Sequence, residues 1–524
     1  MTGVTISRAT PTRNALAALG GLLAGFAALT VAELASAAVR PEAGPVTAVG
    51  GAAIDRTPVG VKDWAIRNFG MHDKLVLQLG IVVVLGLFAL AVGVIALRHR
   101  RPGSAAVLAF GVIGAAAAVN RPDSTGPADA LPSLVGAVAG ALLLYALTGR
   151  LAVRQTSTDP VGWDRRGFLL AATAAAAAST GAGALGRGLN SRRGREAAAS
   201  RSAVRLPAPG SPAEPIPAGA HLRVPGIRPF TTPNKSFYRV DTALVVPRVD
   251  ADSWRLRIHG KGVKRELNLG FQDLLSRPLI ERDITLTCVS NEVGGPYVGH
   301  ARWIGVRLAD LLKEAGVRPP SGGGPADQLI ARSVDGMTLG TPVDDVMDGR
   351  DAMLAVGMNG EPLPLAHGFP VRMVVPGLYG YVSACKWIED IELTTFDEYD
   401  PYWVKRSWAR RAPIRTQSRI DTPKPFARPR AGTVMVAGVA WAQHRGIDKV
   451  EVRVDDGPWQ RAQLAEASTV DTWRQWSFPW KATAGGHTLT VRATDRTGEV
   501  QTEKRTRTAP DGASGRHSVV VTVE

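Results

Sequence analysis

Cysteine is scarce in this sequence, which has only Cys288 and Cys385 among 524 residues. Because the chain has so few thiols, each cysteine is a candidate for a specific role. The chain also lacks a Cys-x-x-Cys-His haem-attachment motif. His72 and His99 flank opposite ends of one apolar stretch and cannot share a haem, so we expect no haem in this chain.

A basic run interleaved with aromatic residues is also missing. The formal net charge is +16, but much of it comes from arginines that flank apolar stretches, and the rest is spread along the chain. Nucleic-acid binding sites concentrate their positive charge on one face or one segment. We therefore expect no nucleic-acid partner.

Cys288 has the most informative surroundings. An alternating run typical of a short strand precedes it, and Asn291, Gly294 and Gly295 after it indicate a turn where backbone can approach a large ligand closely. A thiolate at the end of a strand is a candidate soft metal ligand. Two alternatives remain at this point: a small buried hydrophobe, or a disulfide with Cys385 outside the cytoplasm.

Long apolar stretches occupy the first third of the chain, and the remainder is typical of a soluble protein. Each stretch is long enough, or nearly so, to cross a bilayer core of about 30 Å. The third is the shortest, and a re-entrant or buried helix is its alternative. The five stretches are 14–39, 75–97, 104–119, 131–149 and 168–186.

Arginine placement predicts the orientation of these spans, because cytoplasmic loops carry an excess of Lys and Arg. Three arginine groups fall on one side if all five spans are real, which predicts a multi-pass protein of the cell membrane. Its N-terminus is then cytoplasmic and everything after Gly186 is extracytoplasmic. The groups are Arg8 and Arg13; Arg98, Arg100 and Arg101; and Arg150, Arg154, Arg165 and Arg166. Four arginines that follow the last span, Arg187, Arg192, Arg193 and Arg195, oppose this orientation.

Arg165 and Arg166 begin the last apolar stretch in a run that resembles a twin-arginine export signal. Such signals serve proteins exported already folded, often around a cofactor. The alternative is an ordinary cytoplasmic arginine pair that flanks a span.

Composition divides the chain into four parts: a membrane region over 1–188, an extended linker over 189–229, a domain over 230–409 and a second domain over 410–524. In the third part, β-type runs such as 284–288 and 371–375 alternate with a helical piece over 308–315, which predicts an α+β domain. In the fourth, five strands at regular spacing predict an immunoglobulin-like β-sandwich.

One segment combines cations with tight turns. It contains 358–364, then His367 and Arg372, and later Lys386. The planar guanidinium of Arg372 can donate two parallel hydrogen bonds to a phosphate, and the ammonium of Lys386 provides a compact positive charge. Ordinary structural roles are the alternatives: His367 as a histidine of the core, and Arg372 as an arginine paired with a carboxylate.

From Phe230 onward these motifs resemble the sulfite oxidase family of molybdenum-cofactor enzymes. Segment 232–239 is similar to the family segment that wraps the pterin, Thr287-Cys288 to its metal-ligand loop, and the C-terminal sandwich to its dimerisation domain. The resemblance implies molybdopterin with molybdenum as cofactor, and Cys288 as catalytic residue and metal ligand. It implies cofactor contacts from Asn234, Phe237, Tyr238, Asp335, His367, Arg372, Ala384, Cys385 and Lys386.

The resemblance weakens at the substrate positions. Arg239 matches an arginine that binds sulfite and is the second candidate catalytic residue. Glu292 and Val293, however, stand where sulfite oxidases carry an arginine pair, and Trp408 stands where their catalytic tyrosine falls. Acidic Glu292 would repel sulfite.

We therefore expect a membrane-anchored, molybdopterin-dependent oxidoreductase that transfers an oxygen atom to or from a small oxygenated substrate. One alternative is a sulfoxide-type reductase with the same cofactor, and another is a catalytically silent extracellular binding or assembly module. The enzyme hypotheses imply a separate electron carrier, either a cytochrome or a quinone-linked subunit. The resemblance of the sandwich to the family's dimerisation domain also implies a homodimer.

Overall fold

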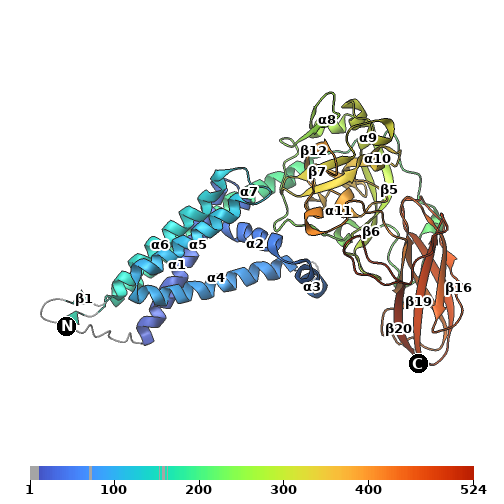
Figure 1. Ribbon diagram of the computed structural model, residues 1–524. Coiled ribbons are helices and arrows are strands. Elements are labelled where there is room, and N and C mark those ends of the chain that lie inside the picture. Colours follow the sequence, from blue (N-terminus) through green and yellow to red (C-terminus); the bar gives the residue numbers. More distant parts are fainter. Residues whose placement is uncertain (1–10, 70–72, 153, 156–159, 162) are drawn as a thin grey trace. The chain divides into compact units, whose positions relative to one another are not determined.

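The computed structural model describes residues 11–69, 73–152, 154–155, 160–161 and 163–524. Arg8 and His72, used above, lie outside the described residues. The chain forms two compact units (Figure 1). The helical unit extends to Glu196 and includes Thr242–Val246; the second unit comprises Ala197–Asp241 and Pro247–Glu524.

Five helices of the described chain are long and apolar enough to cross a membrane. Each covers one predicted apolar stretch, and the third is a full helix of 20 residues. They are α1 (Pro11–Ala38), α4 (Asp73–Arg98), α5 (Arg100–Val119), α6 (Leu131–Leu151) and α7 (Arg165–Ala203). Short elements complete this unit: α2 (Pro45–Arg56), α3 (Val59–Phe69), β1 (Arg154–Gln155) and β2 (Pro160–Val161).

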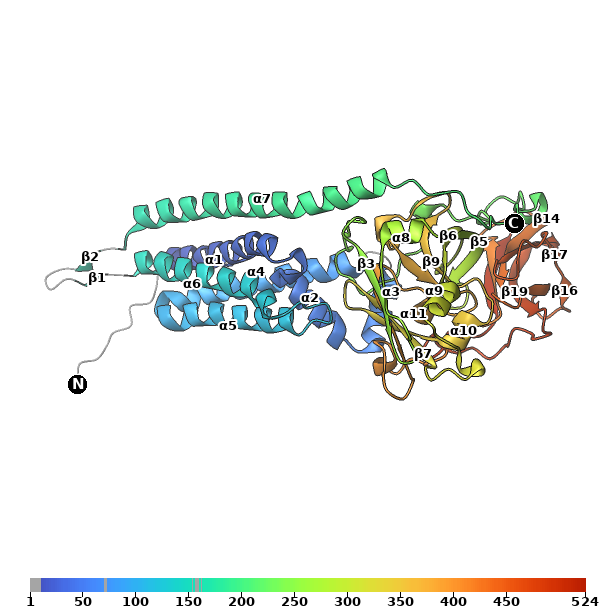
Figure 2. The same cartoon turned by 90° about the horizontal axis from the view of Figure 1, so that it is seen from above.

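Small residues let the long helices approach one another closely (Figure 2). A Cβ added to Gly21 of α1 would lie 2.0 Å from the carbonyl oxygen of Ala89 in α4, and one added to Gly136 of α6 would lie 2.3 Å from that of Ala28. Backbone contact through glycine is typical of helices that associate in lipid, where apolar side chains gain little from meeting each other.

The expected extended linker begins later than the sequence predicts. Helix α7 continues past Leu189 to Ala203, because this stretch is rich in Ala and Arg, which are strong helix formers. The chain that follows Ala203 is irregular, but it is hydrogen-bonded to the strands of the second unit. Ser211 bridges to Ile280, and the backbone N–H of Leu222 donates to Gln475.

The α+β part contains two five-stranded sheets. The first has the order β10-β9-β6-β5, with β11 paired to β9, and all its pairs are antiparallel. Its strands are β5 (Leu279–Thr287), β6 (Val298–Arg307), β9 (Met353–Met358), β10 (Glu361–Pro362) and β11 (Arg372–Val374). Strand β5 ends immediately before Cys288.

The second sheet has the order β4-β3-β12-β7-β8, in which only β3 and β12 run parallel. Its strands are β3 (Arg255–Gly260), β4 (Leu267–Gly270), β7 (Gln328–Ser333), β8 (Thr338–Pro342) and β12 (Ile388–Thr394). Short helices accompany the sheets: α8 (Phe271–Leu275), α9 (Leu308–Glu314), α10 (Val343–Met347) and α11 (Gly380–Ser383). The predicted helical piece over 308–315 is confirmed as α9.

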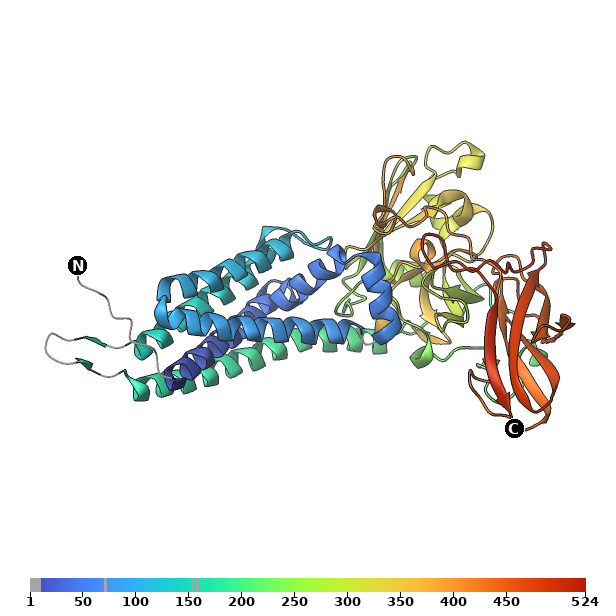
Figure 3. The same cartoon turned by 60° about the horizontal axis from the view of Figure 1, so that its bottom comes forward.

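Residues 417–524 form two four-stranded antiparallel sheets around their own core, which includes Trp476, Val450 and Val491 (Figure 3). We call these sheets the C-terminal sheet pair. The first has the order β13-β14-β18-β17, with β13 (Gln417–Thr422), β14 (Gly432–Trp441), β17 (Gln463–Leu464) and β18 (Arg474–Ala482). The second has the order β16-β15-β19-β20, with β15 (Ile447–Val454), β16 (Gln460–Arg461), β19 (Gly485–Asp495) and β20 (His517–Val523).

The hydrophobic core of the α+β part extends into the sheet pair. Trp303 and Phe369 are buried in it, and so are Val439, Trp441 and Trp473 of the C-terminal strands and their loops. A shared core fixes the end of β5 against both parts.

Candidate cofactor site

Cys288 begins the loop that joins β5 to β6, residues 288–297, which we call the Cys288 loop. Its backbone N–H donates to the carbonyl of Tyr297 at 3.0 Å, and its Sγ accepts the N–H of Ser290 at 3.4 Å. Burial raises the pKa of the Cys288 thiol, while the Ser290 hydrogen bonds and the charge of Lys386 act in the opposite direction. Both cysteines are free, which excludes the disulfide alternative in this structure.

Arg372 lies on β11 and is almost fully buried. One guanidinium nitrogen, Nη1, donates to the carbonyl of His367 at 3.1 Å, and the group lies 5.0 Å from the centroid of the Trp303 ring. Its Nε is buried without a hydrogen-bond partner among the described residues. Burial lowers the pKa of Arg372 to about 10. A buried cation with an unsatisfied donor favours an anionic ligand.

Lys386 follows β11 in sequence and lies close to Arg372. A Cβ added to Gly368, whose φ is +110°, would lie 3.0 Å from the Cβ of Arg372 and 3.1 Å from that of Lys386. The Lys386 ammonium lies 2.7 Å from a carboxylate oxygen of Asp241, and the same oxygen lies 3.4 Å from Nε of Arg239. Arg239 and Lys386 therefore share one buried carboxylate.

The residues from Asn234 to Tyr238 lie beside His367. The carbonyl of Asn234 is 3.1 Å from Nε2 of His367, and the Phe237 ring lies edge-on to the imidazole. Burial lowers the pKa of His367 to about 4, and the charges of Arg372, Lys386 and Arg239 act in the same direction. Phe237 and Tyr238 are stacked, and burial with the nearby Cys288 raises the pKa of Tyr238.

Asp335, Ala384 and Cys385 complete the predicted set. Asp335 follows β7; burial raises its pKa, and the nearby Lys386 opposes this shift. Ala384 and Cys385 lie between α11 and β12, and the Cys385 carbonyl accepts the N–H of Met373. Burial raises the pKa of the Cys385 thiol, Asp335 adds to the shift, and Arg372 opposes it.

The structure thus places the predicted residues in one connected region, although they come from separate segments of the chain. The region presents two thiols (Cys288 and Cys385), three cations (Arg239, Arg372 and Lys386) and two carboxylates (Asp241 and Asp335). A soft sulfur donor beside clustered, partly unsatisfied cations fits a group that combines a soft metal with an anionic phosphate. The residues present therefore fit a molybdopterin cofactor.

The residues that depart from the sulfite-binding pattern occupy different environments. Glu292 is exposed, so solvent screens its charge more than the sequence alone indicates. Trp408 is buried and packs against Tyr381 and Trp403, with ring centroids 5.6 and 5.9 Å away. Repulsion of an anionic substrate by Glu292 is consequently weaker than the sequence predicts.

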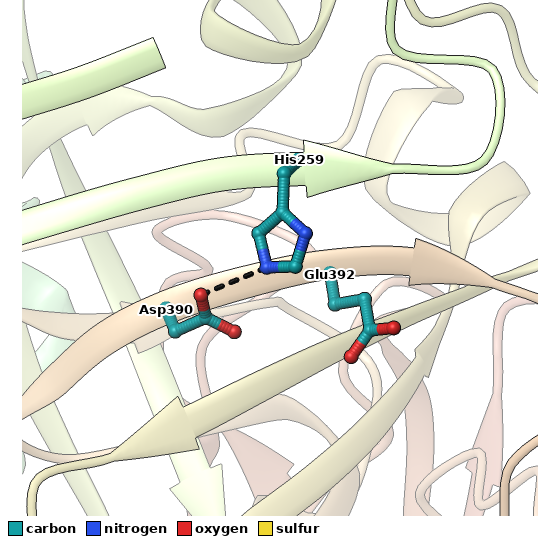
Figure 4. Close-up of side chains that lie close together, drawn as sticks. All are labelled: His259, Asp390 and Glu392. Atoms are coloured by element: carbon teal, nitrogen blue, oxygen red, sulfur yellow. Dashed lines mark hydrogen bonds and ion pairs between the residues drawn. The ribbon is translucent and has the colours of Figure 1, made fainter. Parts of the chain in front are cut away.

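A second group of candidate metal ligands lies on another sheet. His259 of β3 is 2.9 Å from Asp390 of β12, and Glu392 is two residues farther along β12 (Figure 4). Arg332 of β7, however, approaches Asp390 at 3.9 Å and Glu392 at 3.8 Å. The guanidinium already balances these carboxylates, so we interpret the group as a cross-strand charge ladder.

Sequence reasoning did not identify Asp241 or Trp303. Asp241 lies only two residues after Arg239, but one acidic residue gives no signal of its own. Trp303 is an ordinary core residue of β6 until Arg372 is seen to lie over its ring. Both residues are identified as part of the site only by their tertiary contacts.

Comparisons with known proteins give the same assignment. A family described as "Oxidoreductase molybdopterin binding domain" matches residues 243–403, which include Cys288, Arg372 and Lys386. Sulfite oxidase of Gallus gallus is 31% identical over 318 residues, 52% of this chain and 68% of that protein. The uncharacterized oxidoreductase YuiH of Bacillus subtilis is 32% identical over 186 residues, 36% of this chain and 86% of YuiH.

The chain belongs to the sulfite oxidase family of molybdopterin-dependent oxidoreductases. It spans about half the length of the mitochondrial sulfite oxidases that it matches, 49% of the rat protein and 55% of the human one. Among solved structures, the sulfane dehydrogenase SoxCD of Paracoccus pantotrophus aligns with a TM-score of 0.48 and 24% identity, over 57% of this chain and 84% of that one.

Proposed function

We propose that this protein is a membrane-anchored molybdenum-cofactor oxidoreductase that transfers an oxygen atom to or from a small oxygenated substrate outside the cytoplasm. One observation carries the proposal. A free buried thiol, Cys288, lies in the same region as the cations Arg239, Arg372 and Lys386, which come from separate segments of a molybdopterin-binding family domain.

In this proposal Cys288 supplies the single protein thiolate to molybdenum. Arg372 and Lys386 bind the cofactor phosphate, and contacts to the pterin come from the remaining residues, namely Asn234, Phe237, Tyr238, Asp335, His367, Ala384 and Cys385. When bound, the cofactor supplies two-electron redox chemistry coupled to movement of an oxygen atom. The protein fixes the ligand geometry and keeps the site buried.

Arg239 binds the substrate in this proposal. Its side chain is about one-third exposed, while its partner Asp241 is buried. Arg239 can therefore keep one carboxylate contact and still offer donors to an anionic or polar oxygen group on a substrate. Wild-type turnover in an Arg239→Ala protein would contradict this role.

Membrane anchoring rests on the five apolar helices. The arginine distribution supports a cytoplasmic N-terminus and a catalytic domain on the opposite side. The twin-arginine-like run at Arg165-Arg166 agrees with export of a domain that folds around its cofactor first. Cysteine labelling from each side of intact cells, at single cysteines placed near Arg100 and at exposed Ser518, tests this orientation.

The C-terminal sheet pair fits an immunoglobulin-like dimerisation domain of the family type. Substrate turnover also requires an electron partner, and we propose a separate cytochrome or quinone-linked protein. Sedimentation of the detergent-solubilised protein tests the dimer. Reduction of candidate carriers by substrate-treated protein tests the partner.

A second candidate is a sulfoxide-type reductase with the same cofactor. The observation that favours it is the replacement of the sulfite-binding arginine pair by Glu292 and Val293. Sulfite-dependent ferricyanide reduction and sulfoxide-dependent dye oxidation, assayed on one preparation, separate the two directions.

Metal analysis tests the proposal most directly. We expect about one molybdenum per chain in protein made where the cofactor is available. A Cys288→Ser protein should lose the metal but keep its fold by circular dichroism. A metal-free wild-type protein would instead favour a catalytically silent binding or assembly module.

A further inference from the structure

The C-terminal sheet pair contacts the chain on both sides of Cys288. Before Cys288, the contact comes from Gln443, in the loop between β14 and β15. Its side-chain amide, Nε2, donates to the carbonyl of Thr285 at 3.0 Å and to the hydroxyl of Thr287 at 2.9 Å. Gln443 is fully buried, so water does not replace these bonds.

A second loop of the sheet pair also forms hydrogen bonds with β5. The N–H of Thr285 donates to the carbonyl of Asp471 at 2.9 Å, and the N–H of Trp473 donates to the Thr285 hydroxyl at 2.8 Å. The last three residues of β5 therefore make four hydrogen bonds to residues more than 150 positions later in the chain.

After Cys288, the contact comes from β13 and β20. Arg419 donates through Nη1 to the carbonyl of Gly295 at 2.8 Å, while its Nε is held by Asp421 at 2.8 Å. The His517 ring lies against Gly294, where an added Cβ would approach it to 2.2 Å. The φ of Gly294 is +79°, so glycine allows both the turn and this close approach.

Within the described part of the chain, Cys288 itself makes only local hydrogen bonds, to Ser290, Asn291 and Tyr297 of its own loop. The β5–β6 pairing holds both ends of the loop, up to Thr287 and Val298. The sheet pair adds a support from outside, through bonds at Thr285 and Thr287 on one side and at Gly295 on the other. Loss of either outside support is expected to leave the local bonds intact and to increase the motion of the loop.

We propose that Gln443 and Arg419 are positioning residues that hold the Cys288 thiol at the cofactor site, within the same chain. The proposal rests on the proposed function, in which Cys288 is the metal ligand. It gives the sheet pair a role that does not require a second copy of the protein, because each chain supports its own ligand loop.

Reactivity of the two cysteines tests the proposal without enzyme turnover. The full-length protein, made in cells that lack the cofactor, is alkylated with iodoacetamide, and mass spectrometry measures the rates at Cys288 and Cys385. Cys385 is buried, and its described hydrogen bonds, with Met373 and Lys386, involve neither the sheet pair nor the Cys288 loop, so it reports global opening. The ratio of the two rates reports opening of the Cys288 loop alone.

The main variant is Gln443→Glu, which keeps the size of the side chain and removes both donors. Its matched control is Gln475→Glu, because Gln475 is also fully buried in the sheet pair and donates to the carbonyl of Arg228, away from the Cys288 loop. Arg419→Lys tests the support at Gly295 and retains the positive charge. It also serves as the test variant if the Gln443→Glu protein does not accumulate.

We expect the ratio of Cys288 to Cys385 alkylation to rise about tenfold in Gln443→Glu and in Arg419→Lys, and to stay within about twofold of wild type in Gln475→Glu. The loaded Gln443→Glu protein should also lose molybdenum faster on dialysis than Gln475→Glu. Equal ratios in all proteins, or a parallel rise at both cysteines, would overturn the proposal. Molybdenum in the wild-type protein tests the proposed function separately.

Discussion

The ammonium of Lys386 lies 2.7 Å from a carboxylate oxygen of Asp241, and both side chains are largely buried. Arg239 approaches the same oxygen at 3.4 Å. One carboxylate thus contacts two cations. An anion that binds Lys386 and Arg239 would share or replace that role.

Asp241→Asn is therefore expected to destabilise the cofactor-free protein, by about 3 kcal/mol, because removing one partner of a buried ion pair leaves uncompensated charge. The cofactor-loaded protein should lose less, since a phosphate bound at Lys386 offsets the charge of that cation. Thermal unfolding of loaded and cofactor-free protein measures the difference.

Asp390→Asn is the control for that experiment. Asp390 also pairs with a cation, Arg332, and contacts His259, but these side chains are partly exposed. Exposed pairs contribute about 0–1 kcal/mol. An equal loss in loaded and cofactor-free Asp241→Asn would argue against anion binding beside Lys386.

Gly368→Ala should impair cofactor binding more than a glycine change of equal backbone strain. Gly368 has φ +110° and its added Cβ would press on Arg372 and Lys386, whereas Gly349 has φ +100° and open space around it. Both substitutions incur strain of about 1–3 kcal/mol, but only Gly368→Ala displaces the two cations. Molybdopterin content per folded chain, measured for both variants, should fall only for Gly368→Ala.

Stability should fall as the solution becomes acidic. Burial lowers the pKa of His300, His367 and His517 to about 4, compared with about 6.5 in an unfolded chain. Between these values the unfolded chain binds more protons than the folded one, so the free energy of unfolding is highest above pH 6.5 and decreases as the pH falls toward 4.

Each of these histidines contributes up to about 1.4 kcal/mol per pH unit in that window. Denaturant titrations at pH 7, 6 and 5 measure the slope for wild type and for His300→Gln. The variant is expected to show a shallower slope, whatever its absolute stability. An unchanged slope would mean that His300 is not buried in its neutral form.

Arg40→Met should destabilise the helical unit. Arg40 follows α1 and donates two hydrogen bonds to Asp129, which is fully buried, and one to Asp123. Removal of the guanidinium leaves the buried Asp129 carboxylate without its cation, at a cost of about 3–5 kcal/mol, whereas Asp123 keeps its pair with Arg121. Arg56→Met, at a residue whose only described bond is to the Ala52 carbonyl at an exposed position, should have little effect. Unfolding temperatures in detergent compare the two.

Hydropathy and strand alternation predicted the long helices and several of the strands, because both patterns are local. The amphipathic helices α2 and α3 were missed, since neither is long or strongly apolar. The end of α7 was placed too early, because polarity after Gly186 was read as extended chain although Ala and Arg favour helix.

The candidate site was found mainly through resemblance. Periodicity places Cys288 at the end of a strand, but nothing local indicates that Arg372 and Lys386 lie near it. Gln443 and Arg419 could not be identified at all, because an isolated Gln or Arg in a β-rich segment is ordinarily a surface residue. Their burial depends on how the sheet pair packs against β5 and the Cys288 loop.

The membership of Thr242–Val246 in the helical unit has a practical consequence for production of the protein. Lys74 donates to the carbonyl of Ala243, and Leu244 lies directly over Gly50, where an added Cβ would approach it to 2.6 Å. A truncated protein that begins after Ala203 would still contain this apolar strip, but without the helices that cover it. Polar substitutions at Leu244 and Val246 should therefore be made together with the truncation to keep the shortened protein from aggregating.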